Sequence, residues 1–218
     1  MRNKQVKIGF LFDCDGVLID SEWAYSEIWS RINEEYPTGV DNFAQKIKGT
    51  TLSKILNENF PDDITRRKVT DRLNELEQQM KYEMTPGAAH ILDSLHKENI
   101  PAVMVTSSNK LKLQHLRDEL PEFLDFFSCV IDGDMVEKSK PDPEGYLKGA
   151  QYAGCLPKNC VVFEDSLQGV MAGKNSGSYV IGVAGTLPAS DLQPYSDIVV
   201  HSLEDVNLPQ LIEILENR

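Results

Sequence analysis

The sequence predicts an α/β fold: a doubly wound parallel sheet with a helical domain inserted after its first strand. From residue 86 onward, short apolar runs rich in β-branched residues alternate with helix-like segments. Strands that alternate with helices pair in parallel through right-handed crossovers, and near-continuous apolar runs fit a sheet that is covered on both faces. Residues 21 to about 84 interrupt this alternation, because they contain helical segments and no convincing strand.

Six apolar runs are predicted to be the strands of this sheet. Their length and their content of β-branched and aromatic residues are typical of buried strands. In chain order they are VKIGFLF (6–12), PAVMVT (101–106), CVI (129–131), CVVFE (160–164), YVIGV (179–183) and DIVV (197–200).

Four helices are predicted between the later strands. Each candidate segment ends near Gly or Asn, residues that are common where helices stop. They are AAHILDSLHKEN (88–99), NKLKLQHLRDEL (109–120), PEGYLKGAQYAG (143–154) and SLQGVMAGKNSG (166–177).

The inserted segment is predicted to be a small helical bundle. Its clearest helix is DDITRRKVTDRLNELEQQMKYE (62–83), with a charged face opposite an apolar one. The apolar face is formed by residues at helical spacing, which predicts a buried core position for each of them. These residues are Val69, Leu73, Leu76 and Met80.

The domain boundaries follow from this interruption. Pro86-Gly87 marks the return to the alternating pattern, since both residues break regular structure. We expect residues 1–20 and 85–218 to form the main domain, and residues 21–84 to form a cap on two linkers, near residues 20–21 and 82–85.

Composition narrows the class of partner. The chain has 218 residues, of which 41% are hydrophobic and 26% are charged, so it is long enough for one large domain or two modest ones. Its formal net charge of -12 argues against nucleic acid or an anionic membrane as the main partner, because both require a basic surface. A small anionic substrate is still possible, since local donors and a bound cation decide its binding.

Cysteine usage and apolar run length indicate a cytoplasmic protein. The four cysteines show no CxxC spacing, which favours reduced thiols over disulfides or zinc ligands. The longest apolar run near the N-terminus, IGFLF, is too short for a signal sequence or a membrane span. We expect a monomer in the cytoplasm.

The first predicted strand ends in two aspartates, Asp13 and Asp15, that are separated by one residue. On an extended segment, carboxylates at i and i+2 point to the same side and repel each other unless a cation lies between them. A metal site explains this pattern, but so does a simple turn, because Asp and Gly are favoured turn residues.

Polar residues at the ends of other strands favour a site. Ligands of open parallel sheets bind beyond the carboxyl ends of the strands. Unrelated turns are not expected to place carboxylates, hydroxyls and an ammonium group all at that one edge. Taken alone, however, each residue also fits a capping or solvated position. The residues are Asp13, Asp15, Thr106, Ser107, Lys140, Glu164 and Asp165.

These residue types suit a phosphate ester. Carboxylates can hold Mg²⁺, which neutralises charge and orients a phosphoryl oxygen. Hydroxyls of Thr106 and Ser107 can donate to other phosphoryl oxygens, and Lys140 supplies a compact positive charge. One aspartate then remains for attack on phosphorus.

FDCDGVLIDS, VTSSN, KPDP and VVFEDSLQGV, in this order and at these strand ends, resemble the four motifs of the haloacid dehalogenase superfamily. The likeness is strongest to its β-phosphoglucomutase and sugar-phosphate phosphatase branch. It spans essentially the whole chain, because the insertion at 21–84 sits where that branch carries its helical cap. The resemblance therefore implies a Rossmann-like core and a small phosphorylated metabolite as the partner.

The resemblance also implies individual roles. Asp13 would be the nucleophile that forms an aspartyl phosphate, and Asp15 the general acid and base. Mg²⁺ would be bound by the Asp13 carboxylate, the Asp15 main-chain carbonyl and Asp165, with Glu164 assisting. We expect Mg²⁺ and Lys140 to keep Asp13 ionised, and burial together with the charge of Asp13 to raise the pKa of Asp15.

Substrate binding is implied for two further segments. One is Ser107, Ser108 and Asn109 of VTSSN. The other is Lys48-Gly49 in IKGTT, which resembles the cap loop with which this branch contacts its substrate; a solvated helix-end lysine is the alternative for Lys48.

Two departures from the branch favour hydrolysis over isomerisation. β-Phosphoglucomutases carry a histidine at the position of Tyr25, and at that of Leu52 an arginine that holds the second phosphate of a bisphosphate. With neither present, we expect a phosphatase. A phosphate-marked receiver domain is the rival from another class, but receivers are shorter and lack both the cap and the second aspartate. An inactive phosphate-binding protein is a further alternative.

Overall fold

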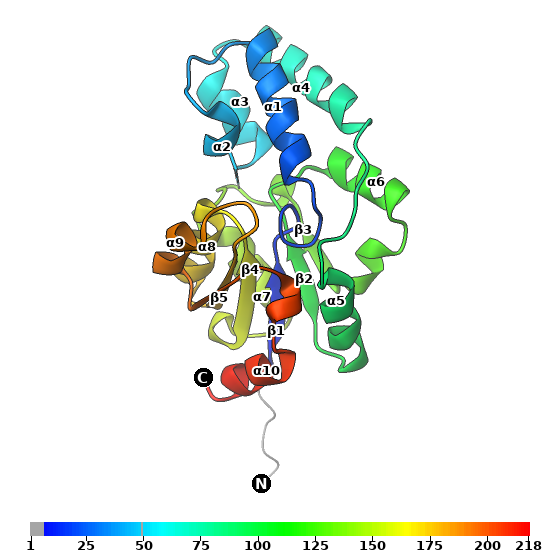
Figure 1. The fold of residues 1–218 in the computed structure, drawn as a ribbon, viewed down its shortest axis with the longest axis vertical. Coiled ribbons are helices and arrows are strands. Elements are labelled where there is room, and N and C mark those ends of the chain that lie inside the picture. The colour runs from blue at the N-terminus through cyan, green and yellow to red at the C-terminus, as the bar shows by residue number, and fades with distance from the viewer. Residues whose placement is uncertain (1–6, 49) are drawn as a thin grey trace.

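The computed structural model describes residues 7–48 and 50–218, without the side chains of residues 22 and 23 (Figure 1). Its centre is a six-stranded parallel sheet in the order β3-β2-β1-β4-β5-β6, which confirms the predicted doubly wound architecture. The strands are β1 (Gly9–Phe12), β2 (Ala102–Val105), β3 (Cys129–Ile131), β4 (Cys160–Glu164), β5 (Tyr179–Val183) and β6 (Ile198–Val200).

The central strand β1 is buried along its whole length. Phe10 pairs with Ala102 of β2 on one side and with Val161 of β4 on the other. The rings of Phe12 and Phe163 stack with centroids 4.6 Å apart, so the ends of β1 and β4 are held in one register. The first predicted strand began earlier in the chain, but the structure starts it at Gly9.

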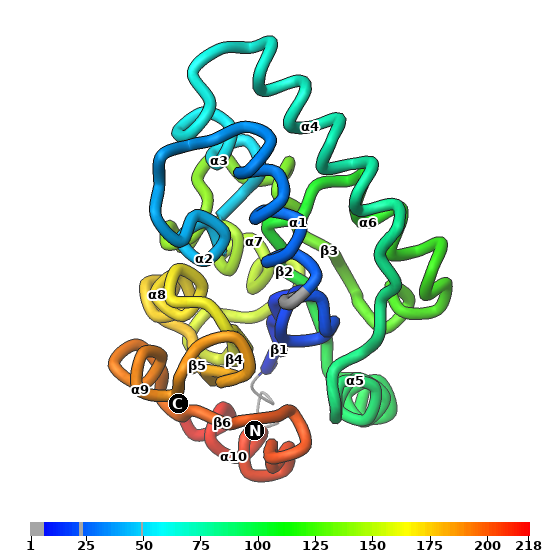
Figure 2. Tube along the Cα trace, turned by 45° about the horizontal axis from the view of Figure 1, so that its top comes forward, coloured from blue at the N-terminus to red at the C-terminus, as the bar shows by residue number. Residues whose placement is uncertain are grey.

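Helices cover both faces of the sheet (Figure 2). On one face of the sheet, Phe10 and Phe12 of β1 pack in an apolar cluster with α5 and α10. On the other face, Leu11 of β1 packs in a second apolar cluster with α7 and α8. No helix in the described part of the chain is long and apolar enough to cross a membrane. The helices outside the insertion are α5 (Ala88–Lys97), α6 (Lys110–Glu119), α7 (Glu144–Tyr152), α8 (Leu167–Ser176), α9 (Ala189–Leu192) and α10 (Leu208–Glu216).

The insertion folds into helices that lie over the carboxyl edge of the sheet (Figure 1). The predicted apolar face of its longest helix is buried, as expected. That helix ends at Glu77, not at residue 83, because the chain turns there and Met80 N–H donates to the Glu77 carbonyl over 3.0 Å. The helices are α1 (Glu22–Glu35), α2 (Phe43–Lys46), α3 (Leu52–Asn59) and α4 (Asp63–Glu77).

The two predicted linkers are hydrogen-bonded to each other. Asp20 N–H donates to the Glu83 carbonyl and Thr85 N–H to the Leu18 carbonyl, each over 2.9 Å. An antiparallel bridge between residues 19 and 84 lies between these bonds. The entry and exit of the insertion are therefore tied together, while the division of the chain into two domains at residues 20 and 85 stays a prediction.

Candidate active site

Three acidic side chains meet where the order of the sheet reverses. Asp13 follows β1, and Glu164 ends the neighbouring strand β4 and is followed by Asp165. The carboxyl edge at such a reversal is the usual ligand site of an open α/β sheet. Each of the three offers an oxygen within 4.8 Å of the others, although they are only 6%, 0% and 1% exposed.

Lys140 is the cation inside this acidic cluster. Its ammonium lies 2.9 Å from Asp13 Oδ1 and also pairs with Glu164. Glu164 in addition accepts a hydrogen bond from Tyr146 Oη over 2.6 Å and one from Ser166 Oγ over 3.0 Å. The protein therefore supplies several donors to Glu164 and shares the one lysine between two carboxylates.

Two glycines make room for these carboxylates. A Cβ on Gly169, in the first turn of α8, would lie 1.8 Å from Glu164 Cδ. A Cβ on Gly16 would lie 2.0 Å from Asp165 Oδ2, and its φ of +73° already favours glycine. The positions of both acidic groups consequently depend on the absence of a neighbouring side chain.

The ionisation of Asp13 depends on its burial and on two neighbouring charges. Burial, and then the charge of Glu164, raise the pKa of Asp13 from 3.8 to about 7, against the lowering effect of Lys140. Lys140 acts in the predicted direction, but it also pairs with Glu164. Without a metal, Lys140 alone therefore does not offset burial and the charge of Glu164, and the ionisation of Asp13 by Mg²⁺ and Lys140 together stays a prediction.

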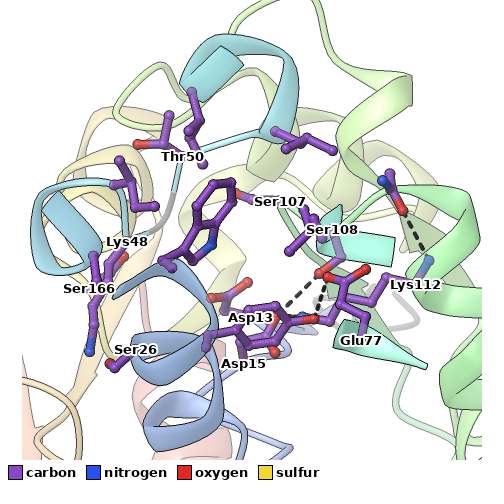
Figure 3. A pocket seen from close by; sticks show the side chains of 18 of the residues that line it. Asp13, Asp15, Ser26, Lys48, Thr50, Glu77, Ser107, Ser108, Lys112 and Ser166 are labelled. Carbon is purple, nitrogen blue, oxygen red and sulfur yellow. Dashed lines mark hydrogen bonds and ion pairs between the residues drawn. The ribbon is translucent and has the colours of Figure 1, made fainter. Parts of the chain in front are cut away.

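Asp15 faces a different set of partners. Ser21 Oγ donates to its Oδ1, while Ser108 Oγ donates to Oδ2 over 3.1 Å and the Lys112 ammonium lies 2.5 Å from the same oxygen (Figure 3). Burial alone would raise the pKa of Asp15, but the charge of Lys112 and these hydrogen bonds together lower it. The predicted rise is wrong because it took no account of Lys112.

Lys112 is one of the residues near the site that could not be predicted from the sequence. Its side chain is buried, and its ammonium also lies 3.9 Å from the ring centre of Tyr25. A weak signal existed, because Lys112 precedes the buried Leu116 by one helical turn and so shares its face. Nothing in the sequence, however, distinguishes an inward lysine there from the neighbouring exposed Lys110.

The VTSSN segment builds the start of α6 beside the carboxylates. The Thr106 hydroxyl accepts a hydrogen bond from Ser108 N–H over 3.0 Å, and Asn109 caps α6 by accepting from Lys112 N–H over 2.9 Å. Ser107 and Ser108 line the cavity above Asp13. Thr106 lines a smaller adjoining cavity together with Lys140.

A cavity lies between the insertion and the sheet edge, with about 820 Å³ of empty space that is partly open to solvent (Figure 3). Its floor carries Asp13, Asp15 and Asp165, and Lys48 lines it from the insertion. Gly49 lies outside the described residues. The other residues that line it from the insertion are Tyr25, Ser26, Trp29, Ala44, Ile47, Thr50, Leu52, Ile55, Leu73 and Glu77.

The acidic cluster has the chemistry of a site for a hard divalent cation. Three buried carboxylates lie together, two of them share the Lys140 ammonium, and all the candidate ligand atoms are oxygens. The side chain of Asp15, which the sequence analysis placed near the metal, is bonded to Lys112, Ser21 and Ser108. Any contribution from Asp15 would therefore use its main-chain carbonyl.

A protein family and several known proteins match most of this chain. Residues 9–177 match the family description haloacid dehalogenase-like hydrolase. Hexitol phosphatase A of Escherichia coli (strain K12) is 33% identical over 208 residues, covering 92% of this chain and 93% of that protein. Beta-phosphoglucomutase of Bacillus subtilis (strain 168) is 26% identical over 219 residues, covering 93% of both chains.

The fold is also found among solved structures. Beta-phosphoglucomutase from Clostridium difficile superposes with a TM-score of 0.79 at 21% identity, covering 97% of this chain and 98% of that one. At this identity the likeness concerns the arrangement of strands and helices, including the helical insertion over the sheet.

Proposed function

The chain belongs to the haloacid dehalogenase-like hydrolases, and we propose that it is a magnesium-dependent phosphatase that hydrolyses a small phosphate monoester through an aspartyl phosphate on Asp13. The observation that carries this proposal is the buried cluster of Asp13, Lys140, Glu164 and Asp165, of which Asp13 and Asp165 line the cavity. A nucleophile and a cation at one buried point are what attack on a phosphate anion requires.

In the first step, a carboxylate oxygen of Asp13 attacks phosphorus and the bond to the ester oxygen breaks. Lys140, Thr106 and Ser107 offer positive charge and hydroxyl donors to the phosphoryl oxygens. Asp15 gives the leaving alcohol a proton. Since the pKa of Asp15 is lowered by Lys112 in this structure, Asp15 must first take up a proton, which the negative charge of an arriving phosphate favours.

In the second step, Asp15 accepts a proton from water as that water attacks the aspartyl phosphate, which releases phosphate and restores Asp13. The carboxylates of Asp13 and Asp165 and the main-chain carbonyl of Asp15 would hold Mg²⁺, with Glu164 beside them. Bound there, Mg²⁺ neutralises phosphoryl charge and orients one oxygen.

A compact phosphorylated sugar or sugar acid is the proposed substrate class. The relative from Escherichia coli is named hexitol phosphatase A, and the cavity combines apolar side chains with a few polar and charged ones, as small-molecule sites do. Ser26, Lys48 and Thr50 provide polar contacts on the wall formed by the insertion. Lys48 would contact one end of the substrate; a contribution from Gly49 also stays part of the proposal.

The cavity favours a phosphatase over a phosphosugar mutase. The relative from Bacillus subtilis is named beta-phosphoglucomutase, so this alternative needs a test. A mutase must hold a bisphosphate, for which a bidentate arginine is the best partner. Among the described residues that line this cavity none is an arginine, Leu52 presents hydrocarbon, and Tyr25 Oη is bonded to Glu77.

We expect phosphate release, not isomerisation, when the protein is incubated with β-glucose 1-phosphate, Mg²⁺ and a trace of the 1,6-bisphosphate. Glucose 6-phosphate and free phosphate are followed together, and chelation of Mg²⁺ should stop the reaction. A panel of hexose, pentose and triose phosphates then ranks the substrates. Rapid isomerisation without phosphate would support the mutase, and an absence of turnover on every ester would favour a receiver-like or inactive binding module.

The proton-transfer role of Asp15 predicts a dependence on the leaving group. Asp15→Asn should lower kcat/KM for a sugar phosphate by ~10²- to 10⁴-fold, the usual effect of losing a general acid or base. The loss should be much smaller for 4-nitrophenyl phosphate, because nitrophenolate leaves without needing a proton and kcat/KM reports only the first step. Equal losses on both substrates would assign the proton to another group.

A further inference from the structure

Glu77 is an acidic residue of the insertion that faces the cavity. It is the last residue of α4 and is only 6% exposed. Figure 3 shows it on the same side of the cavity as Lys112, with Ser26 and Lys48 on the other side of the view. The attack on phosphorus described above does not use it.

The carboxylate of Glu77 has unused capacity to accept hydrogen bonds. An ionised carboxylate can accept about four of them, and Tyr25 Oη donates one, to Oε1 over 2.7 Å. Among residues 7–48 and 50–218, no lysine or arginine nitrogen forms an ion pair with it within 4.0 Å; the nearby Lys112 ammonium pairs with Asp15 instead. Burial, the largest cause, raises the pKa of Glu77, as expected for a carboxylate short of partners.

The charges around Glu77 oppose a second anion. The Lys112 ammonium is paired with Asp15 over 2.5 Å, so among the described residues the Glu77 carboxylate that lines the cavity has no cation in an ion pair with it. A like charge brought next to a buried carboxylate is strongly unfavourable. A hydroxyl group, by contrast, can donate to the open oxygen of Glu77 without adding charge.

We propose that Glu77 selects substrates whose unphosphorylated end is neutral and hydroxylated, by accepting a hydrogen bond from a substrate hydroxyl and repelling a second anionic group. The proposal rests on the phosphatase function given above and narrows it from sugar or sugar-acid phosphates to neutral sugar or polyol phosphates.

Glu77→Gln is a suitable test variant because an amide oxygen can still accept the hydrogen bond from Tyr25. The change therefore removes the charge and leaves the packing in place. Glu75→Gln is the matched control, since it removes the same charge from the same helix at a side chain that is 65% exposed and paired with Arg72. Thermal melting of both variants checks that the fold is intact.

The experiment compares kcat/KM for sorbitol 6-phosphate, 6-phosphogluconate and 4-nitrophenyl phosphate. The wild type should prefer the neutral polyol phosphate to the anionic one. In Glu77→Gln this preference should fall by about tenfold or more, the expected effect of losing a hydrogen bond to a charged group and a repulsion. Turnover of 4-nitrophenyl phosphate should change little, and Glu75→Gln should keep the wild-type preference.

Two results would overturn the proposal: an unchanged preference in Glu77→Gln, or a wild type that favours 6-phosphogluconate. Where turnover of a sugar phosphate is slow, its inhibition constant against 4-nitrophenyl phosphate gives the same comparison. A wild type that releases phosphate from none of the three esters and from no ester of the panel above would instead refute the phosphatase function itself, and this inference with it.

Discussion

Replacing Asp13 by asparagine is expected to abolish phosphate release and, in metal-free buffer, to stabilise the fold. Activity is lost because an amide is a poor nucleophile. Stability rises because Asp13 is buried beside Glu164, and its pKa is raised from 3.8 to about 7. The folded protein thus holds this proton more tightly than the unfolded chain, so stability falls as the pH rises through that range.

Asparagine cannot ionise, so the fall in stability with rising pH that Asp13 causes is absent from Asp13→Asn. Asp13→Asn should therefore melt at a higher temperature than the wild type at about pH 8, and by a smaller margin at about pH 5. Thermal melts with a chelator present measure the difference, and phosphate release with Mg²⁺ measures activity. Asp20→Asn, at an exposed position, is the control and should match the wild type in both. Near-normal turnover in Asp13→Asn would refute the assignment of the nucleophile.

Gly169→Ala is expected to damage the site from a residue that has no functional group. The new Cβ would lie 1.8 Å from Glu164 Cδ, and Glu164 is completely buried between Lys140 and Tyr146. Either the carboxylate or α8 must move. Overpacking of this kind costs about 1–3 kcal/mol of unfolding free energy, and the displaced Glu164 should weaken both the response to Mg²⁺ and kcat/KM.

Gly185→Ala is the matched control, because no atom lies within 4 Å of the position that its Cβ would take. Denaturant unfolding measures the loss of stability, and a Mg²⁺ titration of activity measures the loss at the site. If Gly169→Ala equals Gly185→Ala in both measurements, the close contact between α8 and Glu164 does not constrain the site.

The fold, and the edge of the sheet at which the acidic residues gather, could be predicted from the sequence alone. The alternation of apolar runs and helices repeats along the chain, and the polar residues that follow each apolar run indicate where the strand ends. Once the strands pair in parallel, those ends must meet at one edge. For this reason the sequence predicts that Asp13, Lys140, Glu164 and Asp165 lie together.

The end of the longest inserted helix was predicted less well. The apolar spacing of Val69, Leu73, Leu76 and Met80 continues past Glu77, so the pattern alone extends the helix to residue 83. In the structure Met80 is buried beyond the end of the helix, because the chain turns there towards the second linker. An apolar residue at this spacing therefore indicates that the side chain is buried, but it does not distinguish a helix from the turn that follows it.

The electrostatics of the site could not be predicted in this way, because they depend on contacts between distant segments. Lys112 pairs with Asp15 across 97 residues of sequence, and Lys140 divides its charge between Asp13 and Glu164. The contact with Lys112 lowers the pKa of Asp15, for which a rise was expected, and without a metal Lys140 leaves the pKa of Asp13 raised. A strand end can be read from neighbouring residues, whereas a pKa depends on burial and on every nearby charge, which the packing of distant segments alone brings together.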